Sequence, residues 1–364
     1  MAYLINPDRS LPWNNLPDLP IEDNLFKTIE IYEQLANAKA ALGRLQGRSI
    51  TIPNQGMLIN SISLQEAKAS SAIENIFTTD DELYKAFSEQ RAEQADGAAK
   101  EILRYREALW QGHNYLKDKN TFDEEYFKEI YQQINQTTDG IRPAIAQVYI
   151  RQGGSGPPRG NGIIEAKLSN LLNFMNDDNE HKIDSLLKMA IGHFQFEAIH
   201  PFRDGNGRTG RIFNINYLTN KGLLDYPILF LSGYIMNHKD DYYSGLMGVS
   251  QRGDWKSWII YMLKAVEVSA NITYQKINDI ISAKDAIQQA ITLETDINRP
   301  ESLVNVIFTQ PFTRVKYFTE QRLYAENTAK KYLSQLVDMG ILEQRTLQGK
   351  HYYLNLELYR ILGE

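Results

Sequence analysis

Hydrophobic side chains recur at helical spacing over most of the first 135 residues. Between residues 23 and 87, Leu25, Ile29, Tyr32 and Leu35 follow one another at three or four positions, which predicts an amphipathic helix. The same spacing predicts further helices at residues 63–76, 97–117 and 122–134. The first 20 residues are rich in Pro, Asn and Asp, so we expect an extended arm there.

The pattern changes in the middle of the chain. Residues 145–150, Ile-Ala-Gln-Val-Tyr-Ile, form a short run rich in β-branched and aromatic side chains, which predicts a strand. The Gly- and Pro-rich stretch 153–160 follows and predicts a loop. We therefore expect a small β-hairpin, or flap, set among helices.

Helical spacing then returns, with glycines interrupting it at 205–210. The predicted helices are 165–175, 183–199, 211–220, 240–250 and 255–281. Near the C-terminus the pattern predicts short helices at 303–308, 318–322 and 328–339, and strands at 341–345 and 351–354. Three short helices and a hairpin resemble a winged helix-turn-helix domain. The predicted fold class is mainly α, with a small β-hairpin flap and this C-terminal domain.

Composition narrows the classes of function. The chain has 364 residues, 43% of them hydrophobic, no cysteine and a formal net charge of −6. The absence of cysteine excludes disulfides, zinc–thiolate sites and thiol nucleophiles, and the net charge argues against nucleic-acid binding by the whole surface. No apolar run approaches the ~20 residues of a membrane span, and the first residues lack the pattern of a signal peptide. We expect a cytoplasmic protein without membrane association.

Residues 200–211, His-Pro-Phe-Arg-Asp-Gly-Asn-Gly-Arg-Thr-Gly-Arg, carry the strongest chemical signal. Pro201 disfavours helical backbone at His200, which predicts an imidazole at the end of a helix. Gly205 and Gly207 let backbone N–H groups approach an anion, and the positive end of the next helix points to the same place. The pattern therefore predicts an anion site beside a histidine.

The charged residues of this segment indicate which anion binds. Arg208 and Arg211 lie three positions apart, so both face one side of the first helical turn. Cations there oppose the helix dipole, which is reasonable if a polyphosphate binds them. Asp204 is the lone carboxylate of the loop, and one carboxylate with phosphate oxygens is a common Mg²⁺ site. His200, titrating near neutrality, is suited to removing a proton from an attacking hydroxyl.

Two other phosphate-binding motifs were considered. Residues 205–210 satisfy the dinucleotide fingerprint G-x-G-x-x-G, and Asp225 follows at about the expected ~20 residues. That fingerprint requires a buried strand before it, whereas the preceding stretch is helical, so we reject the Rossmann interpretation. The P-loop motif G-x-x-x-x-G-K-[ST] is absent from the sequence.

The segment resembles the complete signature of the Fic family, His-Pro-Phe-x-[Asp/Glu]-Gly-Asn-Gly-Arg-x-x-Arg. The resemblance implies a protein adenylyltransferase that moves AMP from ATP to a Ser, Thr or Tyr hydroxyl of a protein. It implies that His200 is the general base and that Asp204 holds Mg²⁺. The nucleotide-binding residues it implies are Asp204, Gly205, Asn206, Gly207, Arg208, Thr209, Gly210 and Arg211, with the glycine-rich part on the α- and β-phosphates and the arginines on the β- and γ-phosphates.

The resemblance extends to residues outside the signature. It implies that Val148, Tyr149 and Ile150 form a flap that binds the target segment by β-addition. It also places Asn237, Tyr242 and Tyr243 over the adenine. Some relatives have an adenine-contacting Asn where this chain has Ser250, which leaves the base preference open.

Residues 70–75, Ser-Ser-Ala-Ile-Glu-Asn, resemble the inhibitory motif of the family, [Ser/Thr]-x-x-x-Glu-[Gly/Asn]. Ser70 and Glu74 are four positions apart and share one helical face. The implied regulation is a salt bridge from Glu74 to Arg211 that prevents productive binding of ATP, with Asn75 as the third regulatory residue.

The resemblance implies four parts of the chain: an N-terminal helical region with the inhibitory helix (1–115), the Fic core (116–266), a connecting helix (267–295) and the winged-helix domain (296–364). The target protein stays unknown, self-modification is open, and relatives suggest a homodimer.

Three alternatives also stay open. One is a regulator that binds DNA through the C-terminal domain, at Asn327, Thr328, Lys330 and Lys331, while its Fic core senses nucleotide. Residues 301–364 hold eight basic and seven acidic side chains, a weak footprint for nucleic acid. The others are removal of AMP and transfer of another nucleotidyl or phosphocholine group. A phosphate-transferring branch has Lys at the position of Gly207, which argues for nucleotidyl transfer.

Overall fold

The computed structural model describes residues 3–6, 8, 10–50, 55–88, 97–148, 150, 156–177, 179, 182–347 and 350–363. Before the C-terminal part, the helices are η1 (Asp23–Leu25), α1 (Ile29–Ser49), α2 (Gln55–Ile73), α3 (Asp80–Ser88), α4 (Gly97–Lys119), α5 (Glu124–Asn135), α6 (Ile163–Asn176), α7 (Ser185–Ile199), α8 (Asn206–Asn220), α9 (Leu231–Asn237), α10 (Lys239–Arg252) and α11 (Trp255–Glu294). The mainly helical fold predicted from the sequence is confirmed.

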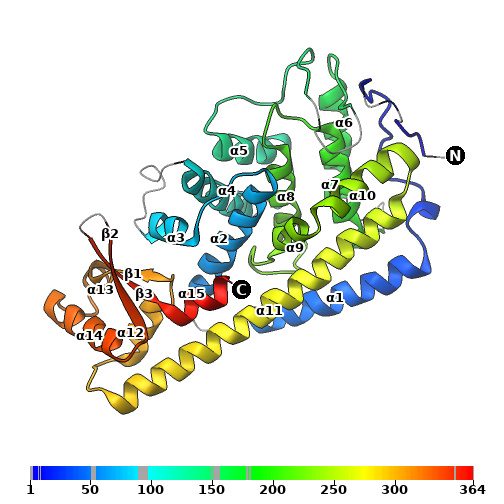
Figure 1. Ribbon diagram of the computed structural model, residues 1–364. Coiled ribbons are helices and arrows are strands. Elements are labelled where there is room, and N and C mark those ends of the chain that lie inside the picture. The colour runs from blue at the N-terminus through cyan, green and yellow to red at the C-terminus, as the bar shows by residue number, and fades with distance from the viewer. Residues whose placement is uncertain are drawn as a thin grey trace.

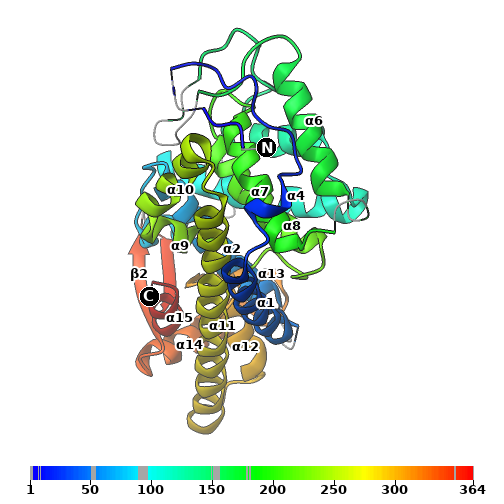
Figure 2. The same ribbon diagram turned by 90° about the vertical axis from the view of Figure 1, so that its right-hand side faces the viewer.

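Helix α11 runs along most of the molecule and joins its two ends (Figures 1 and 2). Its first half packs against α1, which lies parallel to it: Lys256 Nζ donates to Glu30 at 2.6 Å, and Arg48 Nε donates to Asn278 at 2.7 Å. Its second half reaches the C-terminal elements. The helix continues to Glu294, beyond the end at Ile281 predicted from the apolar periodicity and within the predicted connecting helix (267–295).

Helices α7 and α8 form the centre of the larger part of the molecule. Nearly all of their side chains are buried, because α6 and α11 cover α7 while α4 and α5 cover α8. The predicted glycine interruption at 205–210 is wrong, since α8 already begins at Asn206. Gly210 is needed for packing between helices: a Cβ there would lie 2.5 Å from Glu197 Oε1 on α7.

The N-terminal arm has no helix between residues 10 and 20, as predicted. It is nevertheless well packed, because Trp13 is buried and its backbone N–H donates to the carbonyl of Gly156 at 2.8 Å. Asn170 on α6 exchanges two hydrogen bonds with the backbone of Leu19. The arm therefore lies along the loop that leads into α6.

The strand predicted at 145–150 is wrong for the residues that the structure describes there. Residues 144 and 145 form a turn, in which Ala146 N donates to the carbonyl of Pro143 at 2.8 Å, and 146–148 and 150 belong to no strand. Tyr149 lies outside the described residues. β-Branched side chains favour a strand only where a partner strand is available. Gly156, on the far side of the loop, forms an isolated β-bridge with Pro12 of the arm.

The C-terminal unit contains the short helices and the hairpin that the sequence predicts. Its elements are α12 (Pro300–Ile307), β1 (Phe312–Thr313), α13 (Val315–Glu320), α14 (Glu326–Asp338), β2 (Leu342–Leu347), β3 (Lys350–Asn355) and α15 (Leu356–Gly363). The sheet has the order β1-β3-β2 with antiparallel pairs, such as Phe312 with Leu354 and Gln344 with Tyr353. The second predicted helix is shifted, from 318–322 to α13.

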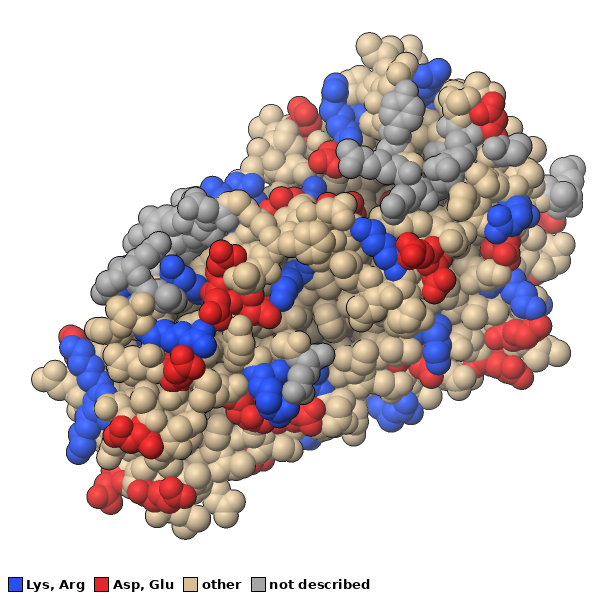
Figure 3. All heavy atoms as spheres, viewed as in Figure 1, with Lys and Arg blue, Asp and Glu red and all other residues tan. Residues whose placement is uncertain are grey.

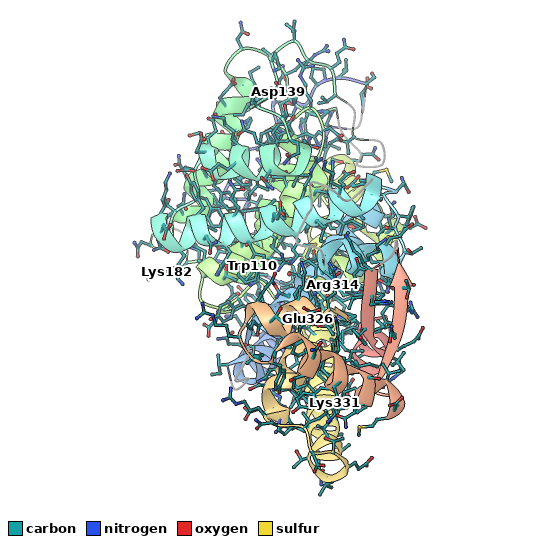
Figure 4. The ribbon with its side chains drawn as sticks, turned by 90° about the vertical axis from the view of Figure 1, so that its left-hand side faces the viewer. Trp110, Asp139, Lys182, Arg314, Glu326 and Lys331 are labelled. Carbon is teal, nitrogen blue, oxygen red and sulfur yellow. The ribbon has the colours of Figure 1, made fainter. Side chains whose placement is uncertain are left out.

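This unit packs against the N-terminal helices as well as against α11. Asp81 on α3 accepts from Arg345 Nη1 at 2.8 Å and from the hydroxyl of Tyr359 at 2.9 Å. Figure 4 shows Arg314, Glu326 and Lys331 on the C-terminal unit, next to the layer formed by α4, which carries Trp110. Helix α15, the last element of this unit, packs against α11 and α2.

Charges of both signs are interspersed over the face of the molecule seen in Figure 3. None of the helices in the described ranges combines the length and the apolar character that a membrane crossing requires.

Candidate functional site

The site forms where α7 ends and α8 begins. His200 ends α7 in the left-handed conformation, with φ of 51°, so the chain turns sharply into the loop 201–205. Phe202 anchors the loop by stacking on Tyr131, with ring centroids 4.2 Å apart. The amide of Asn206 bonds both the N–H and the carbonyl of Phe202 at 2.9 Å. The loop is therefore held in one shape before any ligand binds.

His200 is half-buried and has a defined tautomer. Its Nδ1 lies 3.3 Å from the carbonyl oxygen of Glu197. Because a carbonyl only accepts, Nδ1 carries the proton and Nε2 is left as the basic nitrogen. Burial lowers the pKa of His200 to about 4. The imidazole is thus neutral at pH 7 and ready to accept a proton.

Arg142 positions this histidine, a role that was not predicted from the sequence. Its buried guanidinium donates to the carbonyls of His200 at 2.7 Å, Pro158 at 2.6 Å and Ile199 at 3.2 Å. Its backbone N–H donates to the carbonyl of Pro201 at 2.9 Å. A single arginine in a predicted loop has no periodicity or motif that would mark it.

Arg211 is bound to the end of α2. Its Nε donates to Ser70 Oγ at 2.8 Å, and its Nη2 donates to the Ser70 carbonyl at 3.0 Å and to Glu74 Oε1 at 2.8 Å. The salt bridge expected between Glu74 and Arg211 is therefore present. Burial alone would raise the pKa of Glu74, but the charge and hydrogen bond of Arg211 outweigh it and lower that pKa. The carboxylate is ionised at neutral pH.

Arg208 lines the same pocket but reaches other partners. Its guanidinium donates to Glu101 on α4 and, at 3.2 Å, to Asn135 Oδ1 at the end of α5. Sequence reasoning missed Glu101, because one glutamate on an amphipathic helix resembles any solvated side chain. Arg208 and Arg211 are thus both paired with carboxylates in this structure.

A pocket of about 650 Å³ brings most of the predicted residues together. This volume is in the range of sites for small molecules and cofactors. The predicted residues that line it are Glu74, Asn75, Ile150, His200, Asp204, Gly205, Asn206, Gly207, Arg208, Arg211, Tyr242 and Tyr243. Glu101, Glu197 and Lys239 also line it, and none of these three was predicted.

Several predicted contacts lie elsewhere. Asn237 is exposed and does not line the pocket, so the structure does not support the adenine contact expected of it. Thr209 and Gly210 are buried behind the pocket rather than in its wall, because they lie on the side of α8 that packs into the protein. Val148 lines a separate small cavity beside the arm, at residues 10 and 12.

Two buried residues of the pocket lining, Tyr242 and Glu197, restrict its chemistry. The hydroxyl of Tyr242 lies 2.9 Å from Nε2 of His193, so this tyrosine is held in place by α7. Burial raises the pKa of Glu197 to about 8, and its Oε1 has no hydrogen-bond partner among the described residues. Glu197 therefore carries a proton at neutral pH and adds no negative charge beside Arg211.

Asp204 suits a metal ion that is shared with a phosphate. Its side chain is 87% exposed at the pocket rim, and its Oδ1 accepts from Gly205 N at 2.8 Å. In the described part of the chain, no cluster of three or more His, Asp or Glu side chains could hold a metal alone. A single carboxylate of this kind fits Mg²⁺, which typically completes its coordination with water and substrate phosphates.

Three family models match separate parts of the chain. They are "Fic/DOC family N-terminal" at residues 32–114, "Fic/DOC family" at 121–218 and "Protein adenylyltransferase SoFic-like, C-terminal domain" at 283–358. The second model contains the whole segment 200–211, and the first contains the motif at 70–75.

Curated relatives match over part of their length. The chain is 29% identical over 123 residues to "Protein adenylyltransferase fic-1" of Caenorhabditis elegans, which covers 34% of this chain and 22% of that protein. It is also 29% identical over 163 residues to a probable protein adenylyltransferase of Aquifex aeolicus, covering 44% and 42%. The chain thus spans about a fifth to two fifths of these relatives.

Solved structures share the fold. A Fic family protein from Desulfovibrio desulfuricans G20 superposes with a TM-score of 0.57 at 20% identity, over 93% of this chain and 98% of that one. Fic-1 from C. elegans gives a TM-score of 0.54 at 19% identity, over 68% and 74%. At these identities the likeness concerns the fold alone.

Proposed function

The chain belongs to the Fic family, and from this premise we propose that it is a protein adenylyltransferase. It would transfer AMP from ATP to a Ser, Thr or Tyr hydroxyl of a target protein or of itself. The observation that carries the proposal is a neutral imidazole with a free Nε2 in the same pocket as two buried arginines at a helix N-terminus. The relatives named protein adenylyltransferases support it.

In the proposed reaction, the target oxygen attacks the α-phosphorus of ATP while His200 Nε2 accepts the hydroxyl proton. The new bond joins that oxygen to the α-phosphorus, and the bond between the α-phosphorus and the bridging oxygen to the β-phosphate breaks. Pyrophosphate leaves with the bonding electrons. Asp204 would hold Mg²⁺, which neutralises charge on the phosphate oxygens when it is bound.

The remaining residues orient the nucleotide. The N–H groups at the start of α8, after Gly205, are available to the α- and β-phosphates. Arg208 and Arg211 would neutralise the terminal phosphates, because guanidinium forms strong paired hydrogen bonds to phosphate. Most of the acceleration would come from alignment and charge stabilisation in a preformed site.

We further propose that Glu74 inhibits this reaction. Its carboxylate occupies Arg211, which the γ-phosphate would otherwise bind. Since a charge-assisted hydrogen bond in a partly buried site competes well with a phosphate contact, ATP would bind in a pose unsuited to in-line attack. Activation would require Glu74 to leave Arg211.

The transferred group can be identified directly. Glu74→Gly protein is incubated with Mg²⁺ and ATP labelled at the α- or the γ-phosphate, with and without cell lysate, and its intact mass is then measured. We expect α-label and a mass increase of one adenylyl group, and a loss of about a hundredfold or more in His200→Ala. Retained γ-label would instead identify phosphoryl transfer, and no label even with lysate would refute the proposal.

A further inference from the structure

The last turn of α2 is closed by backbone hydrogen bonds from Glu74 and the two residues that follow it. Glu74 N and Ile76 N both donate to the carbonyl of Ser71 at 3.0 Å, and Asn75 N donates to that of Ala72 at 3.0 Å. Asn75 has a φ of 65°, the left-handed conformation common at helix ends. The carbonyls at such an end need donors from elsewhere once the helix stops.

Lys239 supplies the donor for the next carbonyl. Its Nζ donates to the carbonyl oxygen of Ile73, the last residue of α2, at 2.5 Å. The lysine is half-buried and is the first residue of α10, more than 160 positions further along the chain. This contact ties the nucleotide pocket directly to the residue before Glu74.

The position of Lys239 is electrostatically unfavourable on its own. A cation at the N-terminus of α10 opposes the helix dipole, and the same pocket already holds Arg208 and Arg211. The negative end of α2 and the carboxylate of Glu74 offset that cost. The charge of Lys239 lowers the pKa of Glu74, after the larger effects of Arg211 and Arg208. The lysine therefore stabilises the ionised Glu74 in its place on Arg211.

We propose that Lys239 is a positioning residue of the switch: it holds the last turn of α2, and with it Glu74, over Arg211. This inference rests on the proposed adenylyltransferase function and its inhibition by Glu74. Release of Glu74 then requires the ammonium group to leave the Ile73 carbonyl. A ligand or partner that removes this contact favours the active state.

The test combines Lys239→Met with Glu74→Gly. Label transfer from α-labelled ATP is measured for the wild type, each single variant and the double variant. Lys239→Met changes the rate of label transfer by one factor in the wild-type background and by another in the Glu74→Gly background. The first factor is divided by the second, so that any effect of a direct contact between the ammonium group and ATP cancels. We expect a quotient of about ten, the effect of one hydrogen bond to a charged group. For Lys239→Arg, which keeps a cationic donor, the same quotient should lie close to one. A quotient of one or less for Lys239→Met would overturn the proposal.

Hydrogen exchange tests the same contact without relying on activity. The amides of Glu74, Asn75 and Ile76 should exchange about tenfold faster in Lys239→Met. Lys256→Met, which removes an ammonium group at the start of α11 that is paired with Glu30 on α1, should leave them unchanged. If Glu74→Gly transfers no label, the proposed function fails while this measurement still decides the role of Lys239. Unchanged exchange in Lys239→Met would refute it.

Discussion

At His200, the chemistry depends on a nitrogen that carries no proton. The Glu197 carbonyl fixes the proton on Nδ1, and the carbonyl of His200 itself is held by Arg142. Because both the ring and the backbone of the histidine are fixed, Nε2 can face the pocket without a rearrangement. The pKa of about 4 means that this nitrogen stays unprotonated over the physiological range.

The low pKa of His200 predicts an unusual pH profile. In Glu74→Gly protein at about pH 5.5, kcat/KM should stay near its value at pH 7.5, whereas an unshifted histidine of pKa about 6.5 would lose about tenfold. ATP binding measured at each pH separates effects on the nucleotide. A tenfold loss with unchanged binding would contradict the assignment.

The pKa of His200 also affects stability. It is lower in the folded protein than in the unfolded chain, so the stability contributed by His200 is present above about pH 6.5 and is lost as pH falls towards 4.

The residues that could be predicted are those within a contiguous motif. His200, Asp204 and the arginines were found because twelve neighbouring residues combine an anion site with a base. Arg142, Glu101 and Lys239 are single residues from distant segments. The helices α4 and α10 bring Glu101 and Lys239 to the pocket, whereas Arg142 lies in the loop after α5 and reaches the carbonyl of His200. Asn237 is a residue that was predicted for the site but lies outside it. It is close to the paired tyrosines in the sequence, but its side chain does not line the pocket.

Among the helices, α4 supports the site because it packs closely on both α5 and α8. Gly112 lies at this crossing. A Cβ there would meet the Asn216 amide on α8, and it would lie 2.9 Å from Ile130 Cδ1 on α5. The close approach of the three helices holds Glu101 beside Arg208 and Asn135.

We therefore expect Gly112→Ala to lower the free energy of unfolding by about 1–3 kcal/mol, because the added methyl group overpacks the crossing. Gly43→Ala is the matched control: Gly43 is an exposed helical residue on α1 with open space around its Cα. Removing that glycine should stabilise the protein by about 0.5–1 kcal/mol. Urea unfolding of both variants gives the comparison. A Gly112→Ala protein as stable as Gly43→Ala would show that the crossing is looser than described.

Helices with a regular apolar face were predictable, and elements defined by their neighbours were not. Helices α4, α5, α6, α7 and α14 lie close to their predicted ranges. The described residues of the predicted flap, 145–148 and 150, form no strand, since β-branched side chains favour a strand only where a partner strand is available. Helix α9 has only seven residues, too few for a clear period. The glycines of α8 looked like a break, although Gly210 serves the close packing of α7 on α8.

Over the whole molecule, α11 joins the catalytic core to the C-terminal unit, and that unit also contacts α3 through Asp81. Helix α3 follows Glu74 after a short connection, so the C-terminal unit lies next to the segment that carries the proposed inhibitory residue (Figure 1). DNA binding by this unit stays a prediction: Asn327, Lys330 and Lys331 are exposed on α14, but Lys330 pairs with Glu326 at 2.6 Å.

The most direct test of the account compares initial rates of label transfer from α-labelled ATP, with Mg²⁺, for wild type, Glu74→Gly and the double variant Glu74→Gly/His200→Ala. We expect a rate about tenfold or more higher in Glu74→Gly, because the charge-assisted hydrogen bond that occupies Arg211 is gone. We expect the double variant to retain no label. Equal rates for wild type and Glu74→Gly, or label that persists in the double variant, would contradict it.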